Sequence, residues 1–514
     1  MKLDIFPHEI KAHSPVKSVL LNIIGLLTTL ALCSTVYCEQ DKAEKSGKRS
    51  DATSGKGERL YHESCRPQFH FTPKLGWMND PNGMLFYKGE YHLFFQFDPD
   101  RPNNPCGIKL WGHAVSSDML HWTQLATAIE PDSLGSIWSG SGIVDWNNTT
   151  GFQTGREKPL VCIYTSAGGQ APGSEGKPFT QSIAYSNDRG RTWTKYAKNP
   201  VLKHVVGGNR DPKVFWHDPS KQWVMAIYLD GSDYALFASP DLKQWRRLAD
   251  VPMPGSGECP DFFELPVDGK ADNTKWVFWS ANNRYRLGRF DGKSFTPESE
   301  LLQSHWGKNR YAAQTFADIP AGDGRRIQIA WMAGGTYPNM PFNQQLSFPV
   351  TLTLRTFPEG VRLCTWPVKE IDTLHGKQHH WVGFLKPGKN PLADVRGELF
   401  HVRLEIDPGS AAEVGLNIRG IPIQYSAKER VILCMGNSAP AILIDGRLTL
   451  EVLVDRTSIE IFAADGRVNM AYCLLPSADN KSLSVYVKSG VADVRSLDVW
   501  ELKSTWPQSL VPNP

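Results

Sequence analysis

The chain has 514 residues, of which 41% are apolar and 11% aromatic, and its 56 basic and 53 acidic residues leave a formal net charge of +3. This length and composition suit a folded protein with a large core and two or more domains. No long block of one charge sign stands out after the N-terminal segment. The balance argues against a nucleic-acid partner and against a polybasic membrane surface.

Residues 1–38 have the pattern of a secretory signal peptide. Lys2, Lys11 and Lys17 precede an apolar run over residues 19–32, and small residues follow up to Cys38. The run is shorter than the ~20 apolar residues of a membrane span. We therefore expect cleavage near Cys38, secretion and no stable membrane span, with an uncleaved anchor as the alternative. Residues 39–60 lack bulky apolar side chains until Leu60, which predicts a disordered leader.

Seven cysteines would remain after that cleavage, too few over this length for a disulfide scaffold. The odd number leaves at least one thiol unpaired within a monomer. Cys434 and Cys473 fall in one β-rich region and are candidates for a pair. Sequons at Asn147, Asn148 and Asn480 are consistent with a glycosylated, secreted surface.

Short β-type runs separated by Gly, Pro, Asn and Asp begin near residue 61. Five of these runs are apolar and rich in aromatics, and their starts are 68, 63, 53 and 50 residues apart. The runs are HLFFQF (92–97), LVCIYT (160–165), WVMAIY (223–228), WVFWS (276–280) and RIQIAWM (326–332). Repetition at about 50 residues is typical of propeller blades, in which a middle strand is the most buried.

A second series of Asp-containing turns interleaves with these runs. Its members are SSDMLHW (116–122), SNDRGRTW (186–193), SPDLKQW (239–245) and FDGKSF (290–295). Each fits a reversal between two outer strands of a blade. The two series predict an all-β fold with a five-bladed β-propeller over residues 61–366; a β-sandwich with accidental spacing is the alternative.

The repeat ends after Trp366. The polar sequence of residues 367–380 predicts a connector with one helical turn. Alternating runs with Asp-Gly turns then predict half-buried antiparallel strands, and hence a C-terminal β-sandwich over residues 381–514.

Three acidic residues occupy similar places in their repeats. Asp80 in WMNDPNG (77–83) and Asp211 in RDPKV each lie 12 residues before an apolar run, and Glu258 in ECPDFF lies 18 before one. Asn82-Gly83 and the prolines are turn chemistry, so a strand-entry turn is the simplest interpretation. The recurring acid favours a further role: each would open the innermost strand of its blade, and the three carboxylates would meet at one mouth of the central channel.

Carboxylates in one pocket indicate glycoside chemistry, in which one acid protonates the leaving oxygen and another attacks the anomeric carbon or activates water. Neighbouring like charges raise the pKa of at least one of them. No Gly-rich phosphate loop and no HExxH or CxxC spacing is present, which argues against phosphoryl transfer and metal catalysis. Trp77, Phe95, Trp111, Trp138 and Trp331 are candidate sugar platforms, and Asn79, Gln96 and Ser139 are candidate hydroxyl ligands.

These residues resemble glycoside hydrolase family 32, the β-fructofuranosidases that include invertases, inulinases and levanases. The ordered matches are WMNDPNG (77–83), FFQFDP (94–99), WGHAVSSDMLHW (111–122), WSGS (138–141), RDP (210–212) and ECPDFF (258–263). LVDRTSIEIFAADG (453–466) resembles the C-terminal sandwich of that family. Six motifs in order form a specific pattern, whereas NDPNG alone would be weak.

The resemblance implies a retaining mechanism without metal or cofactor. It implies that Asp80 is the nucleophile, Glu258 the general acid/base and Asp211 the stabiliser of the transition state, with the carboxyls of Asp80 and Glu258 about 5–5.5 Å apart. The positions that match fructosyl-binding residues are Trp77, Asn79, Gln96, Trp111, Trp138, Ser139, Arg210, Tyr311 and Trp331. Gly257 and Asn209 depart from the Trp and Phe of many members, on the leaving-group side.

Sucrose is the first substrate that we expect, as a small-molecule sugar partner, with raffinose and short fructans second. Exo-fructanase activity and fructosyl transfer remain alternatives. A sialidase is a more remote alternative. The turn SNDRGRTW (186–193) favours it, but the cluster of arginines that a sialidase requires cannot be assembled from this sequence. A non-catalytic carbohydrate-binding propeller is another, although all three acids are present.

Overall fold

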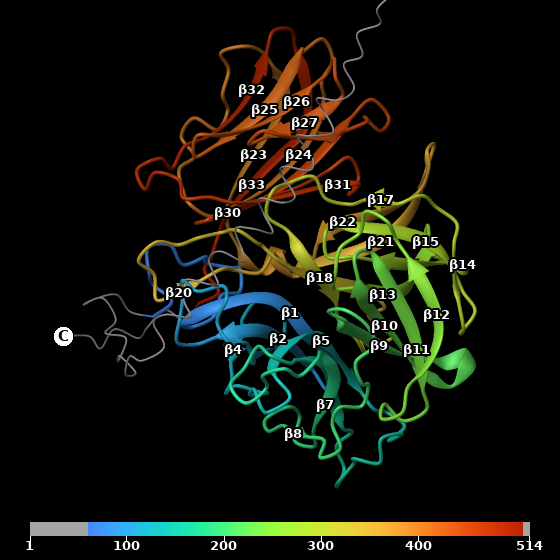
Figure 1. Ribbon diagram of the computed structural model, residues 1–514. Coiled ribbons are helices and arrows are strands. Elements are labelled where there is room, and N and C mark those ends of the chain that lie inside the picture. Colours follow the sequence, from blue (N-terminus) through green and yellow to red (C-terminus); the bar gives the residue numbers. More distant parts are fainter. Residues whose placement is uncertain (1–59, 507–514) are drawn as a thin grey trace, which may run out of the picture. The chain divides into compact units, whose positions relative to one another are not determined.

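The computed structural model describes residues 60–506, which form mainly antiparallel sheets (Figure 1). The expected signal peptide, and the expected leader apart from Leu60, lie outside the described residues. None of the helices within residues 60–506 has the length and hydropathy of a membrane span.

Five blades follow one another along the chain. The first contains β1 (Gly76–Tyr87), β2 (Glu90–Asp98), β3 (Leu110–Ser116) and β4 (Thr123–Gln124); the second contains β5 (Ser136–Val144), β6 (Leu160–Ala167), β7 (Thr180–Ser186) and β8 (Thr194–Lys195). The third contains β9 (Arg210–His217), β10 (Gln222–Asp230), β11 (Asp233–Ser239) and β12 (Arg246–Pro252), with a 3-10 turn, η2 (Asp218–Ser220), between β9 and β10. The fourth contains β13 (Asp261–Val267), β14 (Lys270–Trp279), β15 (Arg284–Phe290), β16 (Phe295–Pro297) and β17 (Leu302–Gln303). The fifth contains β18 (Tyr311–Thr315), β19 (Arg326–Trp331), β21 (Val350–Phe357) and β22 (Gly360–Pro367).

Two strand pairs link neighbouring blades. The short strand β20 (Phe342–Asn343) pairs in parallel with β1, so a late segment of the propeller completes the first sheet. A parallel bridge between Val267 and Leu354 joins the fourth and fifth blades into one nine-stranded sheet. The pair of β20 with β1 ties the end of the propeller to its beginning.

Both sequence series predict the blades correctly. The five apolar runs are the second strands β2, β6, β10, β14 and β19, and every residue of β6 is buried. The Asp-containing turns connect the third and fourth strands of the first four blades. In all four, an Asp side chain accepts hydrogen bonds from backbone N–H groups two to four residues later; the acceptors are Asp118, Asp188, Asp241 and Asp291. SNDRGRTW is therefore one of a set of structural turns, which removes the basis of the sialidase alternative.

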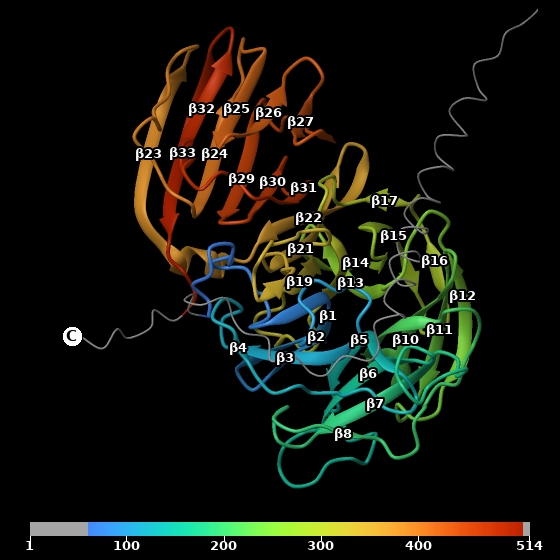
Figure 2. The ribbon, with the colours of Figure 1, turned by 60° about the vertical axis from the view of Figure 1, so that its left-hand side comes forward.

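A β-sandwich follows the propeller, as predicted. One sheet has the order β23 (His375–Leu385), β33 (Ala492–Leu502), β24 (Phe400–Asp407), β29 (Leu448–Asp455), β30 (Ser458–Ala463) and β31 (Val468–Cys473). The other has the order β28 (Asn437–Pro440), β27 (Val431–Cys434), β26 (Ile421–Ser426), β25 (Glu413–Ile418) and β32 (Leu483–Lys488) (Figure 2). A 3-10 helix, η3 (Lys369–Leu374), precedes β23, which begins earlier than the expected boundary at residue 381.

The segment before β1 is hydrogen-bonded to β29 and β30. The His70 ring contacts Asp455 Oδ2 and Glu460 Oε1, both at 2.8 Å, and the backbone N–H groups of Gln68 and Phe69 donate to Asp455. Burial lowers the pKa of His70, but the two carboxylates outweigh it and raise that pKa to about 9. A buried, charged network thus attaches the N-terminal segment to the sandwich.

The proposed pairing of Cys434 and Cys473 is wrong. Both are free thiols. Cys434 ends β27 in one sheet, whereas Cys473 ends β31 in the other and directs its sulfur at the Met332 carbonyl, 3.5 Å away.

Candidate functional site

The first strand of each blade lies innermost, and these strands meet near their first residues. β1 contacts β5 and β18, and β5 contacts β9. The register of strand pairing shifts near the start of four of these strands. The shifts lie at Asn79–Asp80 in β1, at Ser139 in β5, between Arg210 and Lys213 in β9, and between Tyr311 and Gln314 in β18. A bulge leaves a residue without a ladder partner and redirects its side chain. Bulges in these strands therefore present polar side chains at one mouth.

WMNDPNG is part of a continuous strand, so the expected turn at Asn82-Gly83 is not formed, and β1 begins before Asp80 rather than at it. Asn82 instead bridges two blades, because its amide donates to the Asp80 carbonyl and accepts from Gly140 N–H of β5. Gly83 has φ +56°, and a Cβ there would lie 2.5 Å from the Phe94 ring and 3.0 Å from the Trp111 ring. The register of β1 shifts a second time between Asn82 and Leu85, and only glycine fits at this bulge.

Asp80 is buried at the centre of a small hydrogen-bond network. Ser139 Oγ donates to its Oδ2 at 2.6 Å, Gln96 Nε2 donates to the same oxygen at 3.2 Å, and Asn79 Nδ2 donates to Oδ1 at 3.2 Å. Burial raises the pKa of Asp80 to about 6, because the lowering effect of the donors is outweighed and the charge of Glu258 adds to the rise. The Asn79 Oδ1 atom is buried and has no hydrogen-bond partner among residues 60–506.

Asp211 is held by strained backbone at the start of β9. Its φ is +61° and that of Cys259 is +48°, both in the left-handed region that non-glycine residues rarely adopt. Asp211 N–H donates to Thr165 Oγ1 at 2.9 Å, and Cys259 donates to Asp211 Oδ2 from its N–H at 3.2 Å and its thiol at 3.4 Å. Burial, followed by the charge of Glu258, raises the pKa of Asp211.

Glu258 lies in the loop before β13 and is more exposed than the two aspartates. Arg210 donates two hydrogen bonds to its Oε2, from Nε at 2.8 Å and from Nη2 at 2.6 Å, and Tyr311 Oη donates to its Oε1 at 3.0 Å. The Arg210 guanidinium stacks over the Tyr228 ring at 4.5 Å and its Nε lies 3.7 Å from Asp211 Oδ2. The side chain of Glu258 remains 28% exposed, which leaves it open to a ligand and to water.

Cys259 and Arg210 join the three acids into one cluster. The Cys259 thiol lies 3.4 Å from Asp211 Oδ2 and 3.7 Å from Asp80 Oδ2, and Glu258 precedes it in the chain. The structure thus places two buried carboxyl groups beside a more exposed one. This combination provides an anionic group shielded from water and a second carboxyl able to exchange protons with a bound molecule.

The other predicted residues fall into two groups. Asn79, Gln96, Ser139, Arg210 and Tyr311 contact the acids directly, as described above. The aromatic candidates are placed differently: Trp77 is 8% exposed, Trp138 is half-buried against Phe179, and Trp331 donates to Gln344 Oε1 at 2.9 Å with its ring 6.4 Å from that of Tyr311.

Trp111 has no exposed surface and packs against Phe94 and Tyr164. Its indole N–H donates to the Trp138 carbonyl at 3.1 Å. Trp111 therefore supports the bulge of β5 through this hydrogen bond. Its buried ring does not match the expectation that it faces a sugar.

Sequence reasoning missed Cys259, Tyr228 and Thr165 as parts of the site. Cys259 lies within the quoted ECPDFF motif, but its contact with both aspartates depends on its positive φ. Tyr228 and Thr165 each lie in an apolar run that predicted only a buried strand, and they reach the site because β10 and β6 pair with the inner strands.

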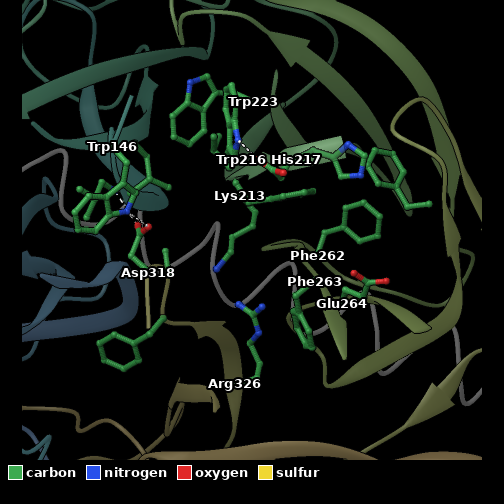
Figure 3. Close-up of a pocket in the computed structure, with 18 of the residues that line it drawn as sticks. Trp146, Lys213, Trp216, His217, Trp223, Phe262, Phe263, Glu264, Asp318 and Arg326 are labelled. Atoms are coloured by element: carbon green, nitrogen blue, oxygen red, sulfur yellow. Dashed lines mark hydrogen bonds between the residues drawn. The ribbon is translucent and has the colours of Figure 1, made fainter. Parts of the chain in front are cut away.

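Residues further along several inner strands line a cavity of about 640 Å³ (Figure 3). The Lys213 ammonium and the Arg326 guanidinium point toward one another there. Lys213 Nζ forms an ion pair with Asp261 Oδ1 at 3.1 Å and donates to the Thr315 carbonyl at 2.8 Å. These contacts hold β9, β13 and the end of β18 together.

Known protein families match both the propeller and the sandwich of this chain. The family described as glycosyl hydrolases family 32 matches with its N-terminal domain over residues 70–367 and with its C-terminal domain over residues 370–501. A levanase from Bacillus subtilis is 40% identical over 87% of this chain and 72% of its own length, and an invertase from Wickerhamomyces anomalus is 37% identical over 54% of this chain and 53% of its own. The crystal structure of an exo-inulinase from Aspergillus awamori is similar with a TM-score of 0.79 and 28% identity, over 87% of this chain and all of that one.

Proposed function

The chain belongs to glycosyl hydrolase family 32, and from this premise we propose that it is an exo-acting β-fructofuranosidase that releases terminal fructosyl units from fructans and also cleaves sucrose. The observation that carries the proposal is the cluster of Asp80, Asp211 and Glu258 in one channel mouth. We assign three distinct roles to these acids because their surroundings differ.

Asp80 is the nucleophile in this proposal. Ser139, Gln96 and Asn79 donate to its two oxygens and orient them, while burial removes the competing water. Glu258 in its acid form protonates the oxygen that leaves C2 of the fructosyl unit, and Asp80 attacks C2 from the opposite face. The C2–O bond to the leaving group breaks as the Asp80–C2 bond forms, which gives a covalent fructosyl ester.

Glu258 then acts as a base toward water. It removes a proton from the water molecule that attacks C2, the ester bond to Asp80 breaks, and fructose leaves with the configuration at C2 retained overall. Arg210 and Tyr311 keep the Glu258 carboxyl in position through both steps. Fructosyl transfer differs only in using a sugar hydroxyl in place of water.

Asp211 binds and stabilises the fructosyl ring in this proposal. Its carboxylate is fixed by the Cys259 N–H and thiol, so it reaches the transition state without reorganising. The unpartnered Asn79 Oδ1 is a second acceptor for a sugar hydroxyl, since a buried acceptor gains a hydrogen bond when the sugar binds.

Fructans are proposed as substrates alongside sucrose for a structural reason. Gly257 precedes Glu258, where many members of the family carry tryptophan. A Cβ at Gly257 would lie 3.5 Å from Tyr311 Oη and 3.6 Å from the Asn282 side chain, which is ordinary contact, so glycine is not required by crowding. Its lack of a side chain leaves room for a leaving group larger than glucose. The long match to a levanase supports the same assignment.

Secretion is part of the proposal and rests on the pattern of residues 1–38. It is tested by sequencing the N-terminus of the protein recovered from culture medium. A new terminus near residue 39 supports it, and an intact N-terminus in the cell fraction contradicts it.

The function is tested by product analysis on sucrose, raffinose, inulin and levan with one enzyme preparation. The proposal requires release of free fructose from the chain ends of inulin or levan as well as from sucrose. Cleavage of sucrose alone contradicts the fructanase part, and oligosaccharides longer than the substrate identify a transferase. Asp80→Asn and Glu258→Gln should each lower kcat at least about 10³-fold. Binding of sucrose without release of fructose by the wild type would identify a non-catalytic protein.

A further inference from the structure

Three side chains at the start of the sandwich bring potential metal ligands together, away from the three acids of the propeller. They are Asp372 in η3, His375 at the start of β23 and His401 in β24. His375 Nε2 lies 2.9 Å from His401 Nδ1 and 3.4 Å from Asp372 Oδ1, and all three atoms lie within 4.8 Å of one another. Within residues 60–506, no other three His, Cys, Asp or Glu side chains meet in this way. We propose that this cluster binds one divalent ion of the zinc class.

The spacing suits tetrahedral coordination. Zinc binds histidine nitrogen at about 2.0–2.1 Å and carboxylate oxygen at about 2.0–2.2 Å, so ligand atoms in a tetrahedral site lie roughly 3.3 Å apart. The 2.9 and 3.4 Å separations bracket this value. The Asp372 side chain is 47% exposed, so it has the freedom to close the remaining gap to His401.

A carboxylate behind His401 prepares the ring for a metal. His401 is fully buried, and its Nε2–H donates to Glu451 Oε1 at 2.6 Å, so its Nδ1 lone pair accepts a hydrogen bond from His375 Nε2–H. Metal binding requires this proton to move to Nδ1 of His375 or to leave, after which both nitrogen lone pairs face the ion. Metal-binding histidines usually donate their second N–H to a carboxylate or carbonyl in this manner. The His375 ring is stacked on Trp500 with centroids 4.3 Å apart, which holds its orientation too.

The local charge also favours a cation. Arg403 donates to Asp372 Oδ1 at 3.0 Å and to Glu451 Oε1 at 3.1 Å, but the two carboxylates outnumber this one guanidinium. A carboxylate has about four lone-pair sites, so Asp372 retains one for a metal while it accepts from Arg403. The exposed side of Asp372 admits a water molecule as the fourth ligand. A bound ion would tie η3 to two strands of the sandwich and stabilise their junction.

The proposal does not depend on fructosyl chemistry, so its test uses binding and stability. The full-length protein is stripped with a chelator and titrated with Zn²⁺ by calorimetry, and the bound metal is measured by elemental analysis. The variants are His375→Phe, which keeps the stack on Trp500 but removes the nitrogen, the exposed Asp372→Asn, and Glu451→Gln. His380→Asn is the matched control, since His380 lies on the same strand, is 53% exposed and pairs with Asp498 outside the cluster.

The wild type and His380→Asn should bind one Zn²⁺ per chain and gain thermal stability from it, and Co²⁺ should give the visible spectrum of a tetrahedral complex. His375→Phe and Asp372→Asn should weaken binding at least tenfold, and Glu451→Gln about 10–100-fold. A circular dichroism spectrum and a cooperative unfolding transition like those of the wild type show that each variant is folded. Less than one Zn²⁺ per wild-type chain, unchanged binding in both ligand variants, or an equal loss in His380→Asn would overturn the proposal.

Discussion

Replacing Asp80 by asparagine should stabilise the folded protein at neutral pH. Asp80 is 8% exposed, and burial raises its pKa from 3.8 to about 6 despite the hydrogen bond from Ser139, with a further rise from the charge of Glu258. The folded state therefore holds this proton more tightly than the unfolded chain. At about 1.4 kcal/mol for each pH unit, ionising Asp80 in the folded protein costs about 3 kcal/mol of folding free energy. The amide of asparagine has nearly the same shape and avoids this cost.

The pH dependence separates this explanation from a packing effect. Between pH 3.8 and about 6 the folded state binds more protons at Asp80, so the contribution of this residue to stability falls as the pH rises through that window. The penalty is complete at pH 7 and nearly absent at pH 4. Asp80→Asn should accordingly gain about 2–3 kcal/mol at pH 7 and little at pH 4.

Urea unfolding of the wild type, Asp80→Asn and the exposed control Asp272→Asn at both pH values measures the gain. Asp272→Asn should show none, because its side chain is in water in both states. An Asp80→Asn protein that is no more stable than the wild type at pH 7, or that gains equally at pH 4, would refute the electrostatic argument. The expected combination of higher stability and lost activity is the trade-off common at active sites.

Three further predictions follow from the same structure. The profile of kcat/KM against pH should fall on its acid side with a midpoint near pH 6, because Asp80 must be ionised to attack; a midpoint below pH 5 would contradict its role. Gly257→Trp should lower kcat/KM about tenfold or more on inulin and levan but less on sucrose, since it fills the leaving-group side, and equal losses on all substrates would count against that geometry. Burial lowers the pKa of His70, but Asp455 and Glu460 raise it to about 9, above its value of 6.5 in the unfolded chain. His70 thus contributes up to about 3 kcal/mol of stability that is fully present below pH 6.5 and lost as the pH rises through 9, and urea unfolding of His70→Gln at pH 6 and 10 should show a flatter profile than the wild type.

The repeating architecture was predictable because each blade carries its own local signal. The second strands are buried on both faces, so they appear as continuous aromatic and aliphatic runs such as LVCIYT in β6. The turns between outer strands need an Asp side chain to satisfy backbone N–H groups, and they repeat for that reason. The distances of Asp80, Asp211 and Glu258 from the following apolar runs predict comparable positions in their blades, and the structure brings these three residues together.

The finer geometry of the site was not predictable because it depends on register between strands. The Asn82-Gly83 pair predicts a turn by its conformational preferences, yet pairing with β2 keeps it in a bulged strand. Trp111 lies in a matching motif, but the direction of its ring depends on which face of β3 meets the second blade. The contact of Cys259 with both aspartates requires a positive φ that a single sequence does not reveal. Each of these features follows from tertiary packing rather than from local preference.

The central claim is that Asp80 forms a covalent bond with the fructosyl unit. It is tested most directly with Glu258→Gln and a β-fructosyl substrate whose leaving group needs no protonation, such as the fluoride. The ester then forms but is hydrolysed slowly, because the base that activates water is missing. Acid quenching followed by peptide mass spectrometry should find one fructosyl unit on the peptide that contains Asp80. A fructosyl unit on Asp211, or rapid fructose release with no trapped adduct and inverted configuration at C2, would contradict the account.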